Sequence, residues 1–190
     1  MHNNLTKIFY FINEFIKDDI NKLDKNIKII YRNYNTKINH KLIKNISNYC
    51  KSNGRKFYIS YHYNLATKFN LDGIYIPAFD HSHSVRNLAC MKKFDILGSA
   101  HNLKELKIKE NQGCNTIFIS PIFKVKKSNS YLDIFKFNNL AKHTNREIIA
   151  LGGINNNNIK KIGLTKSKGF ASISYIKKNG LNKFRPFFKM

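Results

Sequence analysis

Short apolar runs alternate with longer amphipathic stretches along the whole chain. Eight of these runs are rich in β-branched and aromatic residues and have the length of buried strands. They are Lys7–Ile12, Ile27–Arg32, Lys56–Ser60, Gly73–Ile76, Phe94–Ser99, Thr116–Ser120, Glu147–Leu151 and Gly169–Ser174. The pattern predicts eight strands with a helix after each.

The stretches between the runs have helical spacing. In the second of them, Leu42, Ile43, Ile46 and Cys50 fall on one helix face. The predicted helices are Asn13–Leu23, Lys37–Asn53, Tyr63–Phe69, Ser84–Lys92, Leu103–Gln112, Asp133–His143, Asn156–Gly163 and a weak one after Tyr175. The asparagine run 155–158 stands where the seventh helix begins, and asparagine is a favoured N-cap residue, so we expect at least one of these residues to cap it.

Strands that alternate with helices pair in parallel through right-handed crossovers. Eight such units fit an α/β fold of the TIM-barrel type, a closed (β/α)8 barrel, which we expect to form one domain over residues 1–190. The alternative is an open doubly wound sheet, which more often has a G-x-G-x-x-G turn after its first strand, and no such turn is present. The chain is short for a barrel, so its helices must be short.

The net charge of the chain does not alter the predicted fold, but it bears on the class of ligand. The chain carries 34 Lys plus Arg against 11 Asp plus Glu, a formal net charge of +23. Only five of the basic residues are arginines, and they are scattered, whereas nucleic-acid readers favour arginine and clustered patches. We therefore expect no nucleic-acid partner, although an anionic small molecule is consistent with the excess.

The cysteine spacing and the hydropathy of the chain favour a cytoplasmic location. Cys50, Cys90 and Cys114 are far apart and form no C-x-x-C pair, which disfavours a disulfide framework or a zinc site. No apolar stretch approaches the ~18 residues of a membrane span, and the N-terminus lacks the pattern of a secretory signal. We expect a cytoplasmic protein without a membrane partner.

Candidate chemistry gathers where predicted strands end, because active sites of barrels lie at the carboxyl ends of the strands. Arg32 ends the second run and His101 follows the fifth. Gly152-Gly153 follows the seventh run, and Ser174 ends the eighth. A glycine turn bares backbone N–H groups, and phosphate sites of barrels recur after strands seven and eight, so this pair predicts a phosphate site.

Four motifs, in their order and separation, resemble the thiamine phosphate synthase/TenI family. They are Leu71–Pro77, Gly98–Asn102, Ser120–Phe123 and Ala150–Asn155, and the resemblance covers about residues 27–176. It implies a (β/α)8 barrel in thiamine biosynthesis that couples hydroxymethylpyrimidine diphosphate to thiazole phosphate, giving thiamine phosphate and pyrophosphate. This is a transferase reaction, in which Mg²⁺ and basic groups meet the leaving diphosphate.

The resemblance also implies roles for individual residues. Arg32 would contact the diphosphate, Asp80 would bind Mg²⁺ and Ser99 would touch the pyrimidine diphosphate. The thiazole phosphate would lie among Gly152, Gly153, Ile173 and Ser174, held mostly by backbone N–H groups. Lys126 or Lys127 would supply a further cation.

The chain departs from the family pattern at several of these strand ends. Tyr34 stands where the family has a lysine, and Ser60-Tyr61 replaces an Asn-Asp pair whose aspartate is a magnesium ligand. Tyr75 replaces a histidine. Because hard cations need charged oxygen ligands, loss of one carboxylate weakens Mg²⁺ binding.

His101 supports a second interpretation. It matches the histidine of TenI-type thiazole tautomerases, which moves a proton on thiazole phosphate without a metal, and imidazole titrates near working pH. A third interpretation is a binder of phosphorylated ligands without catalysis. The sequence leaves the choice among the three open, along with formation of a homo-oligomer.

Overall fold

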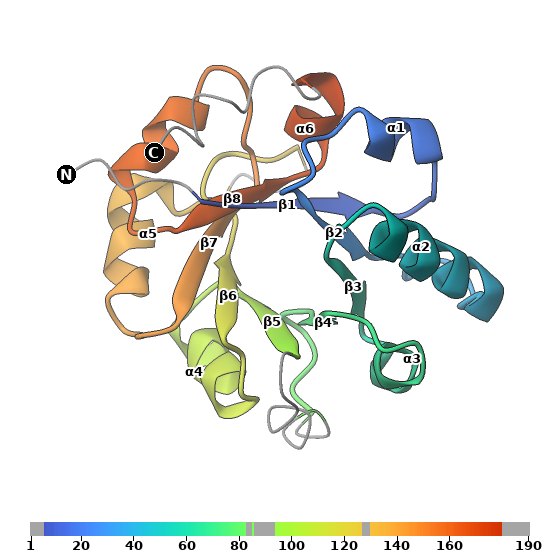
Figure 1. Ribbon diagram of the computed structural model, residues 1–190. Coiled ribbons are helices and arrows are strands. Elements are labelled where there is room, and N and C mark those ends of the chain that lie inside the picture. The colour runs from blue at the N-terminus through green and yellow to red at the C-terminus, as the bar shows by residue number, and fades with distance from the viewer. Residues whose placement is uncertain (1–5, 83–84, 86–93, 127–129, 180–190) are drawn as a thin grey trace.

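A computed structural model describes residues 6–82, 85, 94–126 and 130–179. Eight parallel strands form a closed barrel in which each strand pairs with the next and β8 pairs with β1, with helices around the outside (Figure 1). The strands are β1 Lys7–Ile12, β2 Lys28–Tyr31, β3 Phe57–Ser60, β4 Gly73–Ile76, β5 Asp95–Ala100, β6 Thr116–Ile119, β7 Glu147–Leu151 and β8 Gly169–Ser172. The predicted (β/α)8 architecture is confirmed.

The helices are short, as the chain length requires. They are α1 Lys17–Asn21, α2 His40–Ser52, α3 Tyr63–Lys68, α4 Leu103–Asn111, α5 Asp133–Ala141 and α6 Ser174–Asn179, with a 3₁₀ helix η2 at Ile159–Leu164. The predicted helix Ser84–Lys92 lies outside the described residues apart from Val85.

Most differences from the predicted elements are at their ends. Arg32 and Ser120 lie one residue beyond β2 and β6, and Ser174 begins α6 instead of ending β8. The seventh predicted helix is the 3₁₀ helix η2, which begins later than expected. Asparagine side chains before it bond to nearby backbone, which competes with helix formation.

Two layers of apolar side chains make up the core, because successive side chains of a strand point to opposite faces. In β1, Ile8 and Tyr10 face the helices, whereas Phe9 and Phe11 face the barrel interior. Buried interior residues come from all eight strands: Phe9, Phe11, Ile30, Tyr58, Tyr75, Leu97, Phe118, Ile149 and Ala171. The ring centroids of Phe9 and Phe118 are 4.9 Å apart at an edge-to-face angle, so aromatic rings fill the interior and leave it no channel.

Polar pairs close the amino end of the barrel. The Tyr58 hydroxyl donates to Asp95 Oδ2 at 2.7 Å, and Lys56 Nζ lies 3.3 Å from the same oxygen. This end of a barrel contributes to stability, whereas ligands bind at the carboxyl end. None of the helices described here has the length and apolar character of a membrane span.

Candidate functional site

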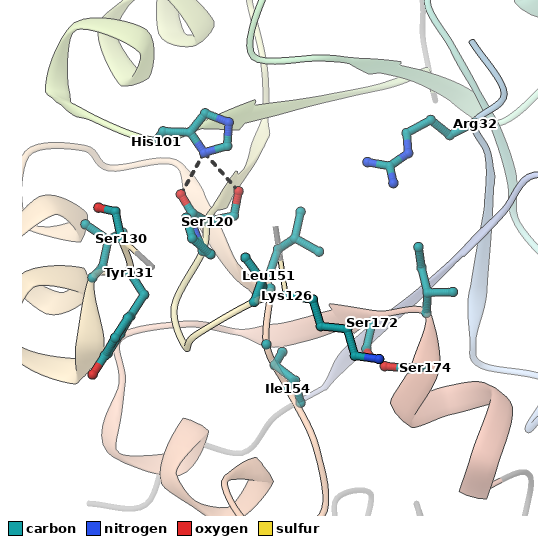
Figure 2. A pocket seen from close by; sticks show the side chains of 16 residues that line it. Arg32, His101, Ser120, Lys126, Ser130, Tyr131, Leu151, Ile154, Ser172 and Ser174 are labelled. Carbon is teal, nitrogen blue, oxygen red and sulfur yellow. Dashed lines mark hydrogen bonds between the residues drawn. The ribbon is translucent and has the colours of Figure 1, made fainter. Parts of the chain in front are cut away.

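A cavity of about 830 Å³ opens at the carboxyl ends of the strands, within the size range of small-molecule sites. Figure 2 shows side chains from the ends of β2 and β5–β8 around it. Its lining comprises Arg32, His101, Ser120, Pro121, Val125, Lys126, Ser130, Tyr131, Leu132, Leu151, Gly152, Gly153, Ile154, Ser172, Ile173 and Ser174. The structure thus brings together seven of the site residues predicted from the sequence.

The Gly152-Gly153 turn lines the cavity, and both of its positions require glycine. Both residues have positive φ, +96° and +70°. A Cβ on Gly153 would lie 2.4 Å from the carbonyl oxygen of Phe123, and one on Gly152 would lie 2.8 Å from Pro121 Cβ. The turn is therefore pressed against the segment that follows β6, and only glycine fits there.

Asparagine side chains fix this turn from the other side. Asn158 Nδ2 donates to the Gly153 carbonyl oxygen at 2.8 Å, and Asn155 Nδ2 donates to the same oxygen at 3.3 Å. Asn158 is the N-cap residue of η2, so the run supplies a residue at the predicted cap position, but its side chain makes no cap bond there. The asparagines instead hold the glycine turn, a role that the sequence pattern alone did not indicate.

The backbone of this wall is available to a ligand. Within the described part of the chain, the N–H groups of Gly153 and Ser174 donate no hydrogen bond to protein atoms, and both residues line the cavity. Ser172 Oγ accepts from the N–H of Tyr175, which fixes the start of α6 beside the turn. Backbone donors of this kind suit a phosphate group.

His101 also lines the cavity and lies directly after β5. Its Nδ1 lies 2.7 Å from the Ser120 carbonyl oxygen and 3.2 Å from Ser120 Oγ (Figure 2). Because a carbonyl oxygen only accepts, Nδ1 must carry the proton, and in the neutral ring Nε2 is then the basic nitrogen. The backbone N–H of His101 donates to Glu105 Oε2 at 2.7 Å, and Asn102 caps α4 through the N–H of Glu105, so the residue is anchored at both ends. Ser120 was not among the predicted site residues.

Arg32 and Lys126 supply positive charge to the cavity. The Arg32 guanidinium carbon lies 4.8 Å from the centroid of the Phe11 ring, which supports it from below. Within the described residues, no carboxylate forms an ion pair with Arg32 or Lys126. Both charges are therefore free to meet an anion.

Three predicted site residues are not part of this cavity lining. Ser99 is 4% exposed and belongs to β5. Asp80 is 7% exposed and lies on the loop after β4. Lys127 lies outside the described residues.

Comparison with known proteins identifies the family. Residues 21–176 match the family model described as thiamine monophosphate synthase. A thiamine-phosphate synthase of Prochlorococcus marinus is 34% identical over 137 residues, which cover 70% of this chain. The chain belongs to the thiamine monophosphate synthase family.

Other relatives agree with this membership. A thiamine-phosphate synthase of Methanococcus vannielii is 28% identical over 63% of this chain. The chain spans 39% of the length of the Prochlorococcus relative and 59% of the Methanococcus one. A thiamine phosphate pyrophosphorylase from Pyrococcus furiosus has the same fold, with a TM-score of 0.74, 17% identity, and coverage of 92% of this chain and 89% of that one.

The resemblance to this family implied Mg²⁺ at Asp80, but the donor set there does not fit the ion. Asp80 Oδ2 accepts a hydrogen bond from the Tyr63 hydroxyl, and Oδ1 accepts from the N–H of Ser82 at 2.9 Å. Tyr61 stands where the resemblance places a second carboxylate. Among the described residues, no three His, Cys, Asp or Glu side chains come together as a metal site. Mg²⁺ demands an octahedron of oxygen ligands, and the described residues around Asp80 offer it a single carboxylate, each of whose oxygens already accepts a hydrogen bond.

Proposed function

We propose that this chain is a thiamine phosphate synthase that binds thiazole phosphate and a pyrimidine diphosphate at the cavity over β5–β8, within a single barrel domain. Family membership supports the reaction class. The observation that carries the proposal is one cavity that combines the Gly152-Gly153 turn with the cations Arg32 and Lys126, which form no ion pair with a carboxylate of the described residues.

The Gly153 turn and the start of α6 fit the phosphate of the thiazole. Donors at Gly153 and Ser174 would anchor that group and so hold the thiazole nitrogen in place for attack. We assign Ile173, which also lines the cavity, and Gly152 to the same subsite.

Arg32 and Lys126 fit the leaving group. In the reaction, the bond between the pyrimidine methylene carbon and the diphosphate oxygen breaks and its electron pair leaves with the oxygen. The thiazole nitrogen then donates its lone pair to the methylene carbon, giving a thiazolium product and pyrophosphate. Cations held in a partly closed cavity stabilise the charge that develops on the departing oxygens.

The direct test is turnover by the purified chain. Incubation with hydroxymethylpyrimidine diphosphate and thiazole phosphate should give thiamine phosphate and pyrophosphate in equal amounts, measured by chromatography and a coupled pyrophosphate assay. Arg32→Met should lower the rate at least tenfold, whereas the exposed Lys104→Met on α4 should leave it unchanged. Absence of thiamine phosphate both with and without divalent ions would refute the proposal.

A second candidate function rests on the His101–Ser120 hydrogen bond. That bond leaves Nε2 as the basic nitrogen beside the thiazole phosphate subsite, an arrangement suited to moving a proton between ring positions, as a tautomerase does. His101→Gln should abolish isomerisation while binding of thiazole phosphate persists. Retained isomerisation would remove His101 from the mechanism and, with it, this candidate.

A further inference from the structure

Three exposed aromatic side chains lie together over the carboxyl ends of β2–β4. Tyr34, Tyr61 and Phe79 are 48%, 49% and 66% exposed, and we call this group the aromatic surface. The Phe79 ring centroid lies 5.6 Å from that of Tyr34 and 6.4 Å from that of Tyr61. These rings form one continuous patch instead of three isolated apolar residues.

The departures from the family pattern meet in this patch. The Tyr34 hydroxyl and Ser60 Oγ are hydrogen-bonded at 2.8 Å, although 26 residues separate them. Tyr61 follows Ser60 with a φ of +69°, in a left-handed conformation that is unusual for a tyrosine. Residues that replace a lysine and an Asn-Asp pair are thus in direct contact with one another. Among the described residues, the part of the carboxyl end where the resemblance places a metal therefore exposes aromatic side chains.

Asp80 beside this patch is held by the scaffold. The fully buried Lys109 of α4 donates from Nζ to the Asp80 carbonyl oxygen at 2.6 Å, and Gln112 Nε2 donates to the same oxygen at 3.0 Å. With Tyr63 and Ser82 bonded to its carboxylate, both ends of the residue are fixed. Its carboxylate therefore acts as a structural acceptor for the β4–β5 loop.

Positive charge lies on the other part of the same face. Partial burial raises the pKa of the Tyr34 phenol, the hydrogen bond with Ser60 and the nearby charge of Arg32 lower it, and the charge of Asp80 raises it, so that the net shift is upward. Arg32 also lines the cavity together with Lys126. An anionic ligand therefore finds counter-charges in the side chains of Arg32 and Lys126.

We propose that this chain binds its anionic ligands without a divalent cation, because the aromatic surface of Tyr34, Tyr61 and Phe79 occupies the place of the metal site and Arg32 with Lys126 supplies the positive charge. This rests on the proposed function only for its choice of pyrophosphate as the probe. The experiment reads binding and not turnover, so it stands even if the chain makes no thiamine phosphate.

The first measurement is a titration of the wild-type chain with Mn²⁺, followed by the electron paramagnetic resonance signal of the free ion. We expect no saturable binding below about 1 mM, since one engaged carboxylate holds a hard cation poorly. Tyr61→Asp returns a second carboxylate to this face and should bind Mn²⁺ at least tenfold more tightly, whereas the matched control Tyr61→Phe should behave as wild type. Saturable Mn²⁺ binding by wild type that Asp80→Asn removes would overturn the proposal, as would a Tyr61→Asp variant that is folded but gains no affinity.

The second measurement is calorimetric titration of the wild-type chain with inorganic pyrophosphate in the presence of EDTA. Binding should be present there and should fall at least tenfold in Arg32→Met. Pyrophosphate binding that appears only after Mg²⁺ is added would show that a metal does bridge ligand and protein, and it would overturn the proposal independently of the first measurement.

Discussion

Replacing Gly153 by alanine separates two reasons for a glycine in the phosphate wall: its backbone conformation and the close approach of the neighbouring segment. Its φ of +70° costs an alanine about 1 kcal/mol. The added Cβ would also lie 2.4 Å and 2.6 Å from the carbonyl oxygens of Phe123 and Lys124, which must move. Overpacking of this kind costs about 1–3 kcal/mol. The expected loss in free energy of unfolding is therefore about 2–4 kcal/mol.

Two other glycines provide matched controls. Gly54 has a φ of +63° with nothing within 4 Å of an added Cβ. Gly54→Ala should therefore lower the free energy of unfolding by only the cost of the backbone conformation, about 1 kcal/mol. Gly163 has neither a positive φ nor a close neighbour, and Gly163→Ala should change stability by less than about 1 kcal/mol.

The assay is urea unfolding followed by tyrosine fluorescence and circular dichroism, combined with calorimetric titration of thiazole phosphate. Because displacement of the turn moves the Gly153 N–H, binding by Gly153→Ala should weaken at least tenfold, while the two control variants bind as wild type. If Gly153→Ala loses no more stability than Gly54→Ala, the close approach of the segment after β6 is not what demands glycine. If its binding is also unchanged, the turn is not the phosphate subsite.

Three further predictions concern groups held away from the cavity. Lys109→Met should lower the free energy of unfolding by about 1–3 kcal/mol in urea, because the buried ammonium bonds backbone and side-chain oxygens, whereas the exposed Lys104→Met should be neutral. Burial raises the pKa of the Cys50 and Cys114 thiols to about 12, so peptide mapping after iodoacetamide treatment should find both unmodified at pH 8 until the chain is unfolded. Burial also raises the pKa of Asp95, but the phenol hydrogen bond and nearby lysines outweigh it and the net shift is downward. Its charged form therefore stabilises the fold above the usual carboxyl pKa and loses that effect as pH falls below it, so Asp95→Asn should show a smaller loss of stability between pH 5 and pH 3.

Much of the candidate site could be predicted from the sequence, because the carboxyl ends of all strands of a parallel barrel lie on one face. In a parallel barrel, residues that directly follow a strand lie at the same end, whatever their separation along the chain. Arg32, His101 and Gly152-Gly153 were predicted on that basis, and all of them line the cavity. Ser99 also stands at the end of an apolar run, but it belongs to β5 itself and is buried.

The architecture, and the end of the barrel where ligands are expected, follow from the sequence pattern alone. Hydrophobic periodicity is a short-range property, so eight apolar runs with helical stretches between them suffice to predict parallel strands and their order. The Gly152-Gly153 turn is also predictable from the sequence, because it directly follows the seventh apolar run. The positive φ of both residues agrees with that prediction.

The contacts between individual side chains, in contrast, depend on the three-dimensional fold. The contacts of Tyr34 with Ser60, of His101 with Ser120 and of Lys109 with Asp80 join residues 19 to 29 positions apart on different elements. Such contacts depend on closure of the barrel and on the rotamers that packing allows. Hydrophobic periodicity in the sequence reports neither of them. For this reason the sequence indicated a weakened metal site, whereas the structure reveals a continuous aromatic surface in its place.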